Sequence, residues 1–440
     1  MARRQGVFGN VLVILGLFIL AGVLVILLPL LRRSDPILPP ESPEITAKRQ
    51  APENAYLVLK EAVDLLPQLP LALPVPDEEV PKIMVKYKPA EGSLGQILNI
   101  ARPDDDPQLT AYLDDCEKAI ARTRDSLMCS YFLLPEIPDT RSIYRDGRSP
   151  LQKTLRDVYQ LRAVLNARGL RSIRAGDCAG AWAWMRDAVR LALLMRNDSG
   201  GVYWNSDGIP GSVLDCLNLM LPACPVETLE QVEADIKALD AELKPSIPTL
   251  ESYLREADQY PLGFSPNALD GPARLMYAVN ASLMRRSIRS WARRNLDDLF
   301  EAFQRPYPEA NRWLEQADQS CGKASDVSSL LRHVRHLIVS DAQAEAGFRG
   351  ATLVVALERY RRVHAAYPES LDALVPGRLD SVPEDPFTGS AFVYKRVDKD
   401  YQLYSLGWGQ SDDGGATIPE GRSRSHSDDV VIHWPPRGPS

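Results

Sequence analysis

Histidine and cysteine, which supply much of the metal and nucleophile chemistry of proteins, are scarce here: the 440 residues include five His and six Cys. No two cysteines form a CxxC pair, which argues against a zinc ribbon or a thioredoxin-type centre. The chain also has no GxSxG, HExxH, phosphate-binding loop or GxGxxG motif. These absences leave the sequence without a recognisable catalytic signature, cofactor or catalytic residue.

An excess of basic charge is lacking too, because the net charge is −7. Proteins that bind nucleic acids neutralise phosphates with a stripe of Lys and Arg side chains. We therefore expect no nucleic-acid partner.

The six cysteines allow two interpretations. In an exported protein they favour one or two disulfides, with Cys216 and Cys224 as the nearest pair along the chain. Cys178 and Cys216, however, lie among apolar residues, as ordinary buried thiols do. The sequence leaves both interpretations open.

Polar side chains are absent from Val11–Leu28, and the apolar run extends over residues 7–31 with Asn10 as its one polar residue. A helix of that length rises about 37 Å, enough to cross a hydrocarbon core of about 30 Å. A cleaved signal peptide would have a shorter apolar core and a small-residue cleavage site. The sequence thus predicts a transmembrane helix at 7–31, through which the bilayer is a partner.

Orientation follows from the layout around this helix. The basic residues on its two sides nearly balance, but residues 1–6 form a short stub and most of the chain follows, as in a signal-anchor. We expect a cytoplasmic stub, a single pass through the inner (cytoplasmic) membrane, and a large domain in the periplasm or outside the cell.

Beyond the anchor, the pattern predicts a mainly α protein. Residues 32–52 are rich in proline and predict an extended linker. Residues 53–341 show apolar residues at helical spacing and predict a helical domain. Its predicted helices begin near residue 53 and continue at 109–128, 151–175, 179–195, 212–221, 226–242, 247–257, 272–298 and 324–340. The tight Gly176-Asp177 link predicts a helical hairpin, the unit of tetratricopeptide-like arrays, although no 34-residue repeat is present.

The composition changes near residue 342, and residues 342–436 predict a small α+β module. One helix is expected at 342–364, a helical turn at 370–374, a hairpin of strands at 391–397 and 401–406, and a third antiparallel strand at 430–434. The fold class is therefore an N-terminal transmembrane helix, a hairpin-type helical domain and a C-terminal α+β module.

This last part resembles the C-terminal domain of the major pseudopilin of type II secretion systems. The likeness covers about 90 residues and rests on the long helix and on the following positions: Tyr367-Pro368, Leu371, Leu374, Asp385-Pro386-Phe387, Gly389, Tyr394 and Leu403–Gly407. The whole chain looks like a class of uncharacterised bacterial membrane-anchored proteins that carry such a module.

The resemblance implies a calcium site in the loop after the 401–406 strand. Calcium binds six to eight oxygens, and the matching ligands here are Asp412, Asp413 and Asp428, with the Leu406 carbonyl as a further one. Trp408-Gly409 departs from the family, which has an Asp-Gly-like pair there. The alternative is a solvated acidic loop without metal.

Two features separate the chain from a true pseudopilin. Pilin-type helices carry a Glu five residues after the processed Gly, whereas the positions after Gly6 and Gly9 are Val11 and Ile14. About 300 residues also separate the anchor from the module. We therefore expect the apolar helix to be a permanent membrane anchor that is not processed.

Three functional hypotheses follow. The first is a membrane-tethered envelope protein with a protein-interaction or scaffolding role, acting through a protein partner or self-association. The second is an enzyme that acts on envelope substrates through a pocket in the helical domain. The third is an accessory component of a secretion or pilus-like system.

Overall fold

The computed structural model describes residues 36–67, 107–135, 150–198, 208–259, 286–321, 325–412, 414–415 and 429–433. The stub at 1–6 and the predicted transmembrane helix at 7–31 lie outside these ranges. Within them, no helix combines the length and the apolar character that crossing a bilayer demands.

The described chain is mainly helical with a small antiparallel sheet, as predicted. Its α-helices are α2 (Pro43–Gln50), α3 (Ala55–Asp64), α5 (Pro107–Asp115), α6 (Glu117–Ser126), α8 (Pro150–Arg174), α9 (Cys178–Asp198), α10 (Gly208–Met220), α11 (Val226–Glu242), α12 (Ile247–Gln259), α14 (Leu296–Ala302), α15 (Tyr307–Ser320) and α16 (Ser325–His364). Short 3-10 helices are η1 (Leu221–Ala223) and η3 (Leu371–Leu374).

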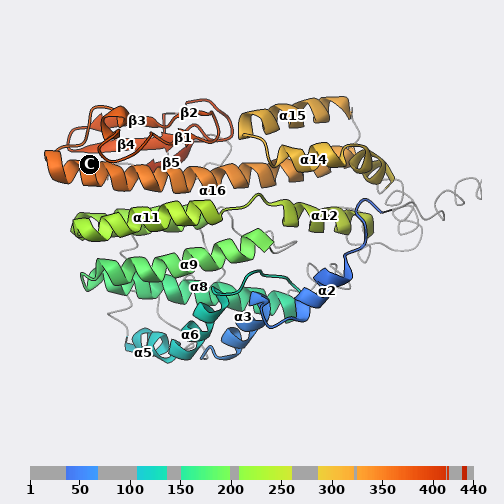
Figure 1. Ribbon diagram of the computed structural model, residues 1–440, viewed down its shortest axis with the longest axis horizontal. Helices are drawn as coiled ribbons and strands as arrows, with labels where there is room; N and C mark the ends of the chain where they lie inside the picture. Colours follow the sequence, from blue (N-terminus) through green and yellow to red (C-terminus); the bar gives the residue numbers. More distant parts are fainter. Residues whose placement is uncertain are drawn as a thin grey trace, which may run out of the picture.

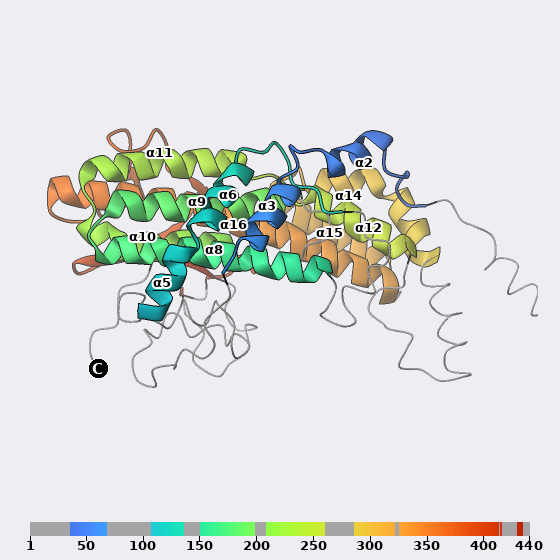
Figure 2. The same cartoon turned by 90° about the horizontal axis from the view of Figure 1, so that it is seen from below.

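The helices stack in layers on both sides of α16. In Figure 1 the sheet, α14 and α15 lie above α16, α11 and α12 lie directly below it, and α9 and α8 follow. The smaller helices α3, α5 and α6 form the last layer. Figure 2 shows that most of the long helices run along the same axis of the molecule. One apolar core joins helices from α9 onward with the strands, and a second joins α3, α5, α6, α8 and α9.

The predicted hairpin is formed by α8 and α9, which pack along each other. Gly176 ends the first helix with φ 75°, a left-handed conformation that glycine adopts without a Cβ penalty. Asp177 then begins the second helix, and its carboxylate accepts a hydrogen bond from the Gly180 backbone N–H at 2.9 Å. Gly176 thus ends one helix and Asp177 caps the start of the next.

The prediction of separate helices at 324–340 and 342–364 is wrong, because α16 runs without a break from Ser325 to His364. Every apolar side chain between Ala344 and Leu357 is buried, and from Gly350 to Leu357 the helix is buried on all sides. The fully buried apolar residues in this stretch are Ala344, Ala346, Phe348, Ala351, Leu353, Val354, Val355, Ala356 and Leu357. A helix that is apolar around its circumference needs neighbours on every side, and the layers supply them.

The extended linker predicted for 32–52 is wrong at residues 43–50, which form α2. Ser42 caps this helix by accepting a hydrogen bond from the Ile45 N–H, and Pro43 occupies the first helical position, where its missing N–H costs nothing. Ile37 and Leu38 are buried in the main core, and Arg255 of α12 donates to the Pro39 carbonyl at 2.6 Å. This segment is therefore attached to the helical body.

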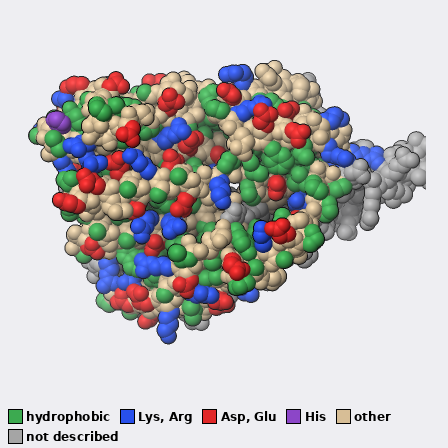
Figure 3. Space-filling model, viewed as in Figure 1, with side chains coloured by type: hydrophobic (Ala, Val, Ile, Leu, Met, Phe, Trp, Pro, Cys, Tyr) green, Lys and Arg blue, Asp and Glu red, His purple; other side chains and the backbone are tan. Residues whose placement is uncertain are grey.

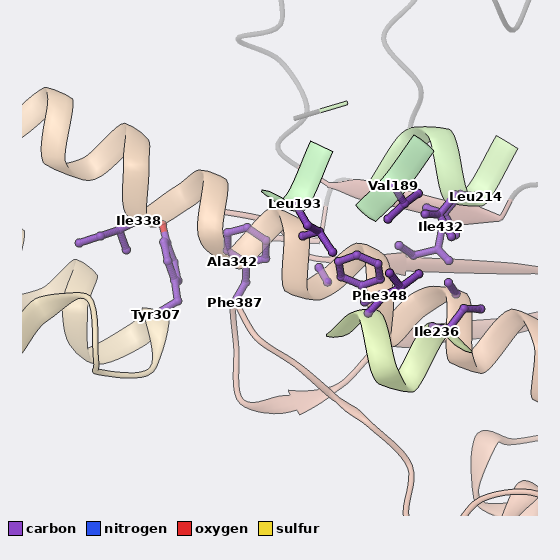
Figure 4. Packing of buried hydrophobic residues seen from close by; sticks show 14 of the residues in the cluster. Val189, Leu193, Leu214, Ile236, Tyr307, Ile338, Ala342, Phe348, Phe387 and Ile432 are labelled. Atoms are coloured by element: carbon purple, nitrogen blue, oxygen red, sulfur yellow. The ribbon is translucent and has the colours of Figure 1, made fainter. Parts of the chain in front are cut away.

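The strands are β1 (Glu384–Asp385), β2 (Ser390–Ala391), β3 (Val393–Val397), β4 (Asp400–Ser405) and β5 (Val430–His433). The last three form one antiparallel sheet in the order β3-β4-β5, as predicted, and β1 pairs with β2 separately. Ile432 of β5 packs on α16 at Gly350, and Figure 4 shows it in the apolar cluster with Leu214 and Val189. His433 binds Asp400 of β4 at 2.8 Å and Asn218 of α10 at 3.1 Å, and so fixes the edge strand to the helices.

Gly350 sets how closely the sheet approaches α16, since a Cβ there would lie 2.7–2.9 Å from three side-chain atoms of Ile432. We expect Gly350→Ala to lower the free energy of unfolding by about 1–3 kcal/mol through overpacking. Denaturant titration measures this change. Adding Ile432→Ala should cancel the effect of the new methyl group, because it removes the atoms that the methyl group meets.

The matched control is Gly169→Ala in α8, where a Cβ would meet its nearest atoms at ordinary contact distances of 3.4–3.9 Å. Because alanine has a higher helix propensity than glycine, the free energy of unfolding of this variant should be unchanged or up to about 1 kcal/mol higher. A Gly350→Ala variant as stable as the Gly169→Ala variant would contradict the packing argument.

Candidate functional site

A pocket of about 480 Å³ opens beside the middle of α16. It lies where α11 gives way to α12 on one side of α16, and where the β1–β2 segment gives way to α15 on the other (Figure 1). Four segments distant in sequence line it: the end of α11 with residues 243–245, the α14–α15 link at 302–307, α16 from 338 to 349, and residues 384–389. The volume is within the range of small-molecule sites.

α16 presents a polar stripe to this pocket. Asp341, Glu345 and Arg349 are four residues apart and therefore lie on one face of the helix. Glu345 and Arg349 form an ion pair, and Arg349 also donates to the Glu384 carbonyl at 2.7 Å. The stripe thereby links α16 to strand β1.

Asp341 is held by fixed partners rather than left for a ligand. Its carboxylate accepts hydrogen bonds from the Ser246 hydroxyl and, at 2.8 Å, from the Ser246 N–H, and it forms an ion pair with Arg196 of α9. Burial raises the pKa of Asp341, and Arg196 and Ser246 oppose that shift. This side chain joins α9, the α11–α12 link and α16, so its role is structural.

Asp240, in the last turn of α11, differs from Asp341 in having no fixed partner among the described residues. Within the described chain its half-buried carboxylate makes no hydrogen bond and no ion pair. Burial raises its pKa to about 6, nearby Arg349 lowers the pKa, and nearby Glu345 raises it. Asp240 is therefore a carboxyl group in a pocket that changes its charge close to neutral pH, which is typical of functional sites.

The wall opposite α11 is aromatic. The Tyr307 ring packs edge-on against Phe387 with 4.8 Å between ring centroids, and both lie beside Ala342 and Ile338 of α16 (Figure 4). The Tyr307 hydroxyl donates to the Trp408 carbonyl at 3.1 Å. The pocket wall is thus joined to the turn that follows β4.

That turn, residues 407–410, is fixed by several hydrogen bonds. Asp385 is fully buried and accepts hydrogen bonds from the Ser405 hydroxyl at 2.8 Å and from the Leu406 N–H at 3.1 Å. Gly407, with φ 59°, donates to Ser405, and the Gln410 side chain donates to the Phe387 carbonyl. On this rigid turn the Trp408 side chain remains 47% exposed.

Of the residues predicted to bind calcium, Asp413 and Asp428 lie outside the described residues. Asp412 accepts hydrogen bonds from the Tyr404 hydroxyl at 3.0 Å and from the Gly414 N–H at 2.8 Å, and the Leu406 N–H points to Asp385. Asp429 accepts a hydrogen bond from the next amide, Gly415, at 2.8 Å. The loop therefore brings Asp412 and Asp429 to adjacent backbone amides. No cluster of three metal-ligating side chains is found among the described residues.

His333 and the cysteines also have structural surroundings. His333 stacks on Tyr253 of α12 with 3.7 Å between ring centroids, and burial lowers its pKa to about 3, so the imidazole is neutral at physiological pH. The six cysteines are all free thiols, which agrees with the interpretation of Cys178 and Cys216 as buried thiols.

The pocket residues Asp240, Glu345 and Arg349 were not predicted as a site. A sequence signal did exist, namely the four-residue spacing of Asp341, Glu345 and Arg349 immediately before the apolar stretch that ends at Leu357. The expected break near residue 341 hid this spacing.

No family model, curated protein or solved structure matches the chain. The resemblance to the pseudopilin module accordingly rests on the residues that carry it and stays a prediction.

The predicted calcium site leads to a thermal-shift experiment. Calcium near 1 mM, where weak extracellular sites bind, should raise the melting temperature of the chain, and Asp412→Asn should abolish that rise. The asparagine keeps an oxygen for Tyr404 and Gly414 but loses the charge. Asp372→Asn, at an exposed carboxylate of η3, is the control. A melting temperature that calcium leaves unchanged would contradict the site.

Proposed function

We propose that this protein is a membrane-tethered envelope protein that binds a partner protein through the Trp408 turn. The observation that carries the proposal is the half-exposed indole on a turn fixed from three sides, by Asp385, Tyr307 and Gln410. Tryptophan is the residue most enriched at the energetic centres of protein interfaces. A rigid turn also presents it without an ordering cost.

The surroundings support this role. On the face shown in Figure 3, acidic and basic side chains are interspersed, and hydrophobic side chains gather over the region of α12 and α14. A mixed surface of this kind suits protein contacts better than a polyanion. The partner is expected in the envelope, in line with the inner-membrane anchor at 7–31 and the extracytoplasmic orientation predicted from the sequence. The α8–α9 hairpin would then serve as a tetratricopeptide-like scaffold.

An enzyme acting on envelope substrates is the second candidate, because the pocket contains the convergent carboxylates that such a function uses. Asp240, with its pKa near 6, has the property of a general acid or base at neutral pH. The residues that line the pocket include no Ser, Thr, Cys or His. The contact role at Trp408 therefore remains the leading proposal.

The tether is tested by alkaline carbonate extraction of membranes. The full chain should stay in the membrane pellet, since an apolar helix of residues 7–31 partitions into the bilayer. A chain that begins at residue 36 should appear in the supernatant. The intact mass of the mature protein distinguishes an anchor from a cleaved signal peptide. Extraction of the full chain by carbonate would contradict the tether.

The contact is tested with a photoreactive amino acid at position 408 of the full chain in native membranes. We expect one discrete crosslinked species, and we expect Trp408→Ala to reduce partner recovery at least tenfold, as loss of an interface hot spot does. The same amino acid at Met128, which is 82% exposed beyond α6, is the control.

Mass spectrometry of the crosslinked species separates the outcomes. A second protein supports the proposal, whereas two copies of this chain would replace the partner with self-association. Equal crosslinking at 128 and 408, or none at 408, would overturn the proposal.

A further inference from the structure

We propose that the pocket beside α16 binds a small organic cation, an ammonium or guanidinium group on an apolar stem, with Asp240 as its counter-ion. The site is separate from the exposed Trp408 indole and does not depend on the contact proposed there. The argument rests on the charge of the lining, the partners of each charged side chain and the apolar walls.

The lining carries five acidic side chains and three basic ones. The acidic residues are Asp240, Asp341, Glu345, Glu384 and Asp385, and the basic residues are Lys244, Arg305 and Arg349. Local pairs account for most of these charges. Asp341 is paired with Arg196, Arg305 binds Glu301 at 3.0 Å, and Glu345 is paired with Arg349. Asp385 is satisfied by the hydroxyl and amide donors of the β4 turn.

Asp240 remains as the half-buried carboxylate to which no described residue donates a hydrogen bond. The Asp240 oxygens are not sealed from solvent, but partial burial raises the free energy of the ionised carboxylate, and a cation beside it would offset that cost. Arg349 is near enough to lower the pKa of Asp240, but its guanidinium donates to Glu345 and to the Glu384 carbonyl. A cation entering the pocket would supply the missing donors.

The apolar side chains that line the pocket indicate the chemistry of the rest of the ligand. Leu243 and Pro245, which follow Asp240 in the chain, line the pocket together with Phe303, Tyr307 and Ile338. Apolar and aromatic side chains favour a hydrocarbon stem, and an aromatic face also attracts a cation. The cavity volume of about 480 Å³ admits a ligand larger than an inorganic ion.

Binding should depend on pH because Asp240 must be ionised. The charged groups near enough to act on it are Arg349 and Glu345 of α16. The other charged groups that line the same pocket are Asp341 of α16, Lys244 from the α11–α12 link, Arg305 from the α14–α15 link, and Glu384 and Asp385 from β1. Burial raises the pKa of Asp240 to about 6, whereas an alkylamine stays protonated to about pH 10. Lowering the pH from 7.5 to 5 should therefore weaken binding about tenfold.

The experiment is isothermal titration calorimetry of the full chain in detergent against phenethylamine and agmatine, with a micelle blank. We expect saturable binding at pH 7.5, about tenfold weaker binding at pH 5, and no binding of 2-phenylethanol, the neutral analogue of phenethylamine. Asp240→Asn should weaken amine binding at least tenfold. Glu227→Gln, which removes an exposed charge from the first turn of the same helix, is the matched control.

Folding of the Asp240→Asn variant is checked separately. The folded-state pKa of Asp240 lies above its ordinary value, so its ionisation removes stability as the pH rises from about 4 to 6. The variant should therefore melt at the same or a higher temperature at pH 7.5. Absence of saturable amine binding, equal binding of 2-phenylethanol, or unchanged binding to Asp240→Asn would each overturn the proposal.

Discussion

The burial of the apolar middle of α16 between two layers is the constraint on which the structure depends. Residues 344–357 expose almost no apolar surface, so the helix must have one layer above it and another below. Its last turns add charge to this packing. Arg359 pairs with Glu230 and Glu233 of α11, and Arg362 donates to the carbonyls of Leu221 and Cys224. The central helix is thereby fixed to α11 along its side and to η1 at its carboxyl end.

The pocket is a consequence of the same arrangement. A 40-residue helix is longer than any of its neighbours, so its sides are covered by pairs of elements placed end to end. Where one neighbour ends and the next begins, α16 is uncovered, and there its sequence changes from apolar to Asp341, Glu345 and Arg349. The polar stripe and the gap between neighbours coincide because an apolar surface at that position would be exposed to water. The ion pair of Asp341 with Arg196 joins this stretch to α9, and the hydrogen bond from Arg349 to the Glu384 carbonyl joins it to β1.

Local patterns predicted the elements well where the determinants are local. The bounds of α11 match the predicted 226–242, and the α8–α9 hairpin and the β3–β4 hairpin lie where periodicity and turn residues place them. Predictions failed where a contact with a residue distant in sequence determines the local structure. Ser340-Asp341 looks like a helix end, yet Asp341 pairs with an arginine 145 residues away and the helix continues. The half-buried state of Asp240 likewise arises from segments 62 to 149 residues later in the chain, which periodicity within α11 does not reveal.

The loop after β4 can be held together by hydrogen bonds or by a calcium ion. The resemblance predicted from the sequence is to a family in which such a loop binds calcium and its turn carries an Asp-Gly-like pair. Here the amides of Gly414 and Gly415 bond to Asp412 and Asp429, and these hydrogen bonds join described residues on the two sides of the loop. A calcium ion would have to use the second oxygen of each carboxylate or replace these amides. This chain has Trp408-Gly409 where the Asp-Gly-like pair is expected, and an indole cannot coordinate a metal but can fill a hydrophobic pocket of another protein. The exposed Trp408 side chain, on a turn that Asp385 holds by hydrogen bonds, therefore connects the fold of the module to the proposed contact function.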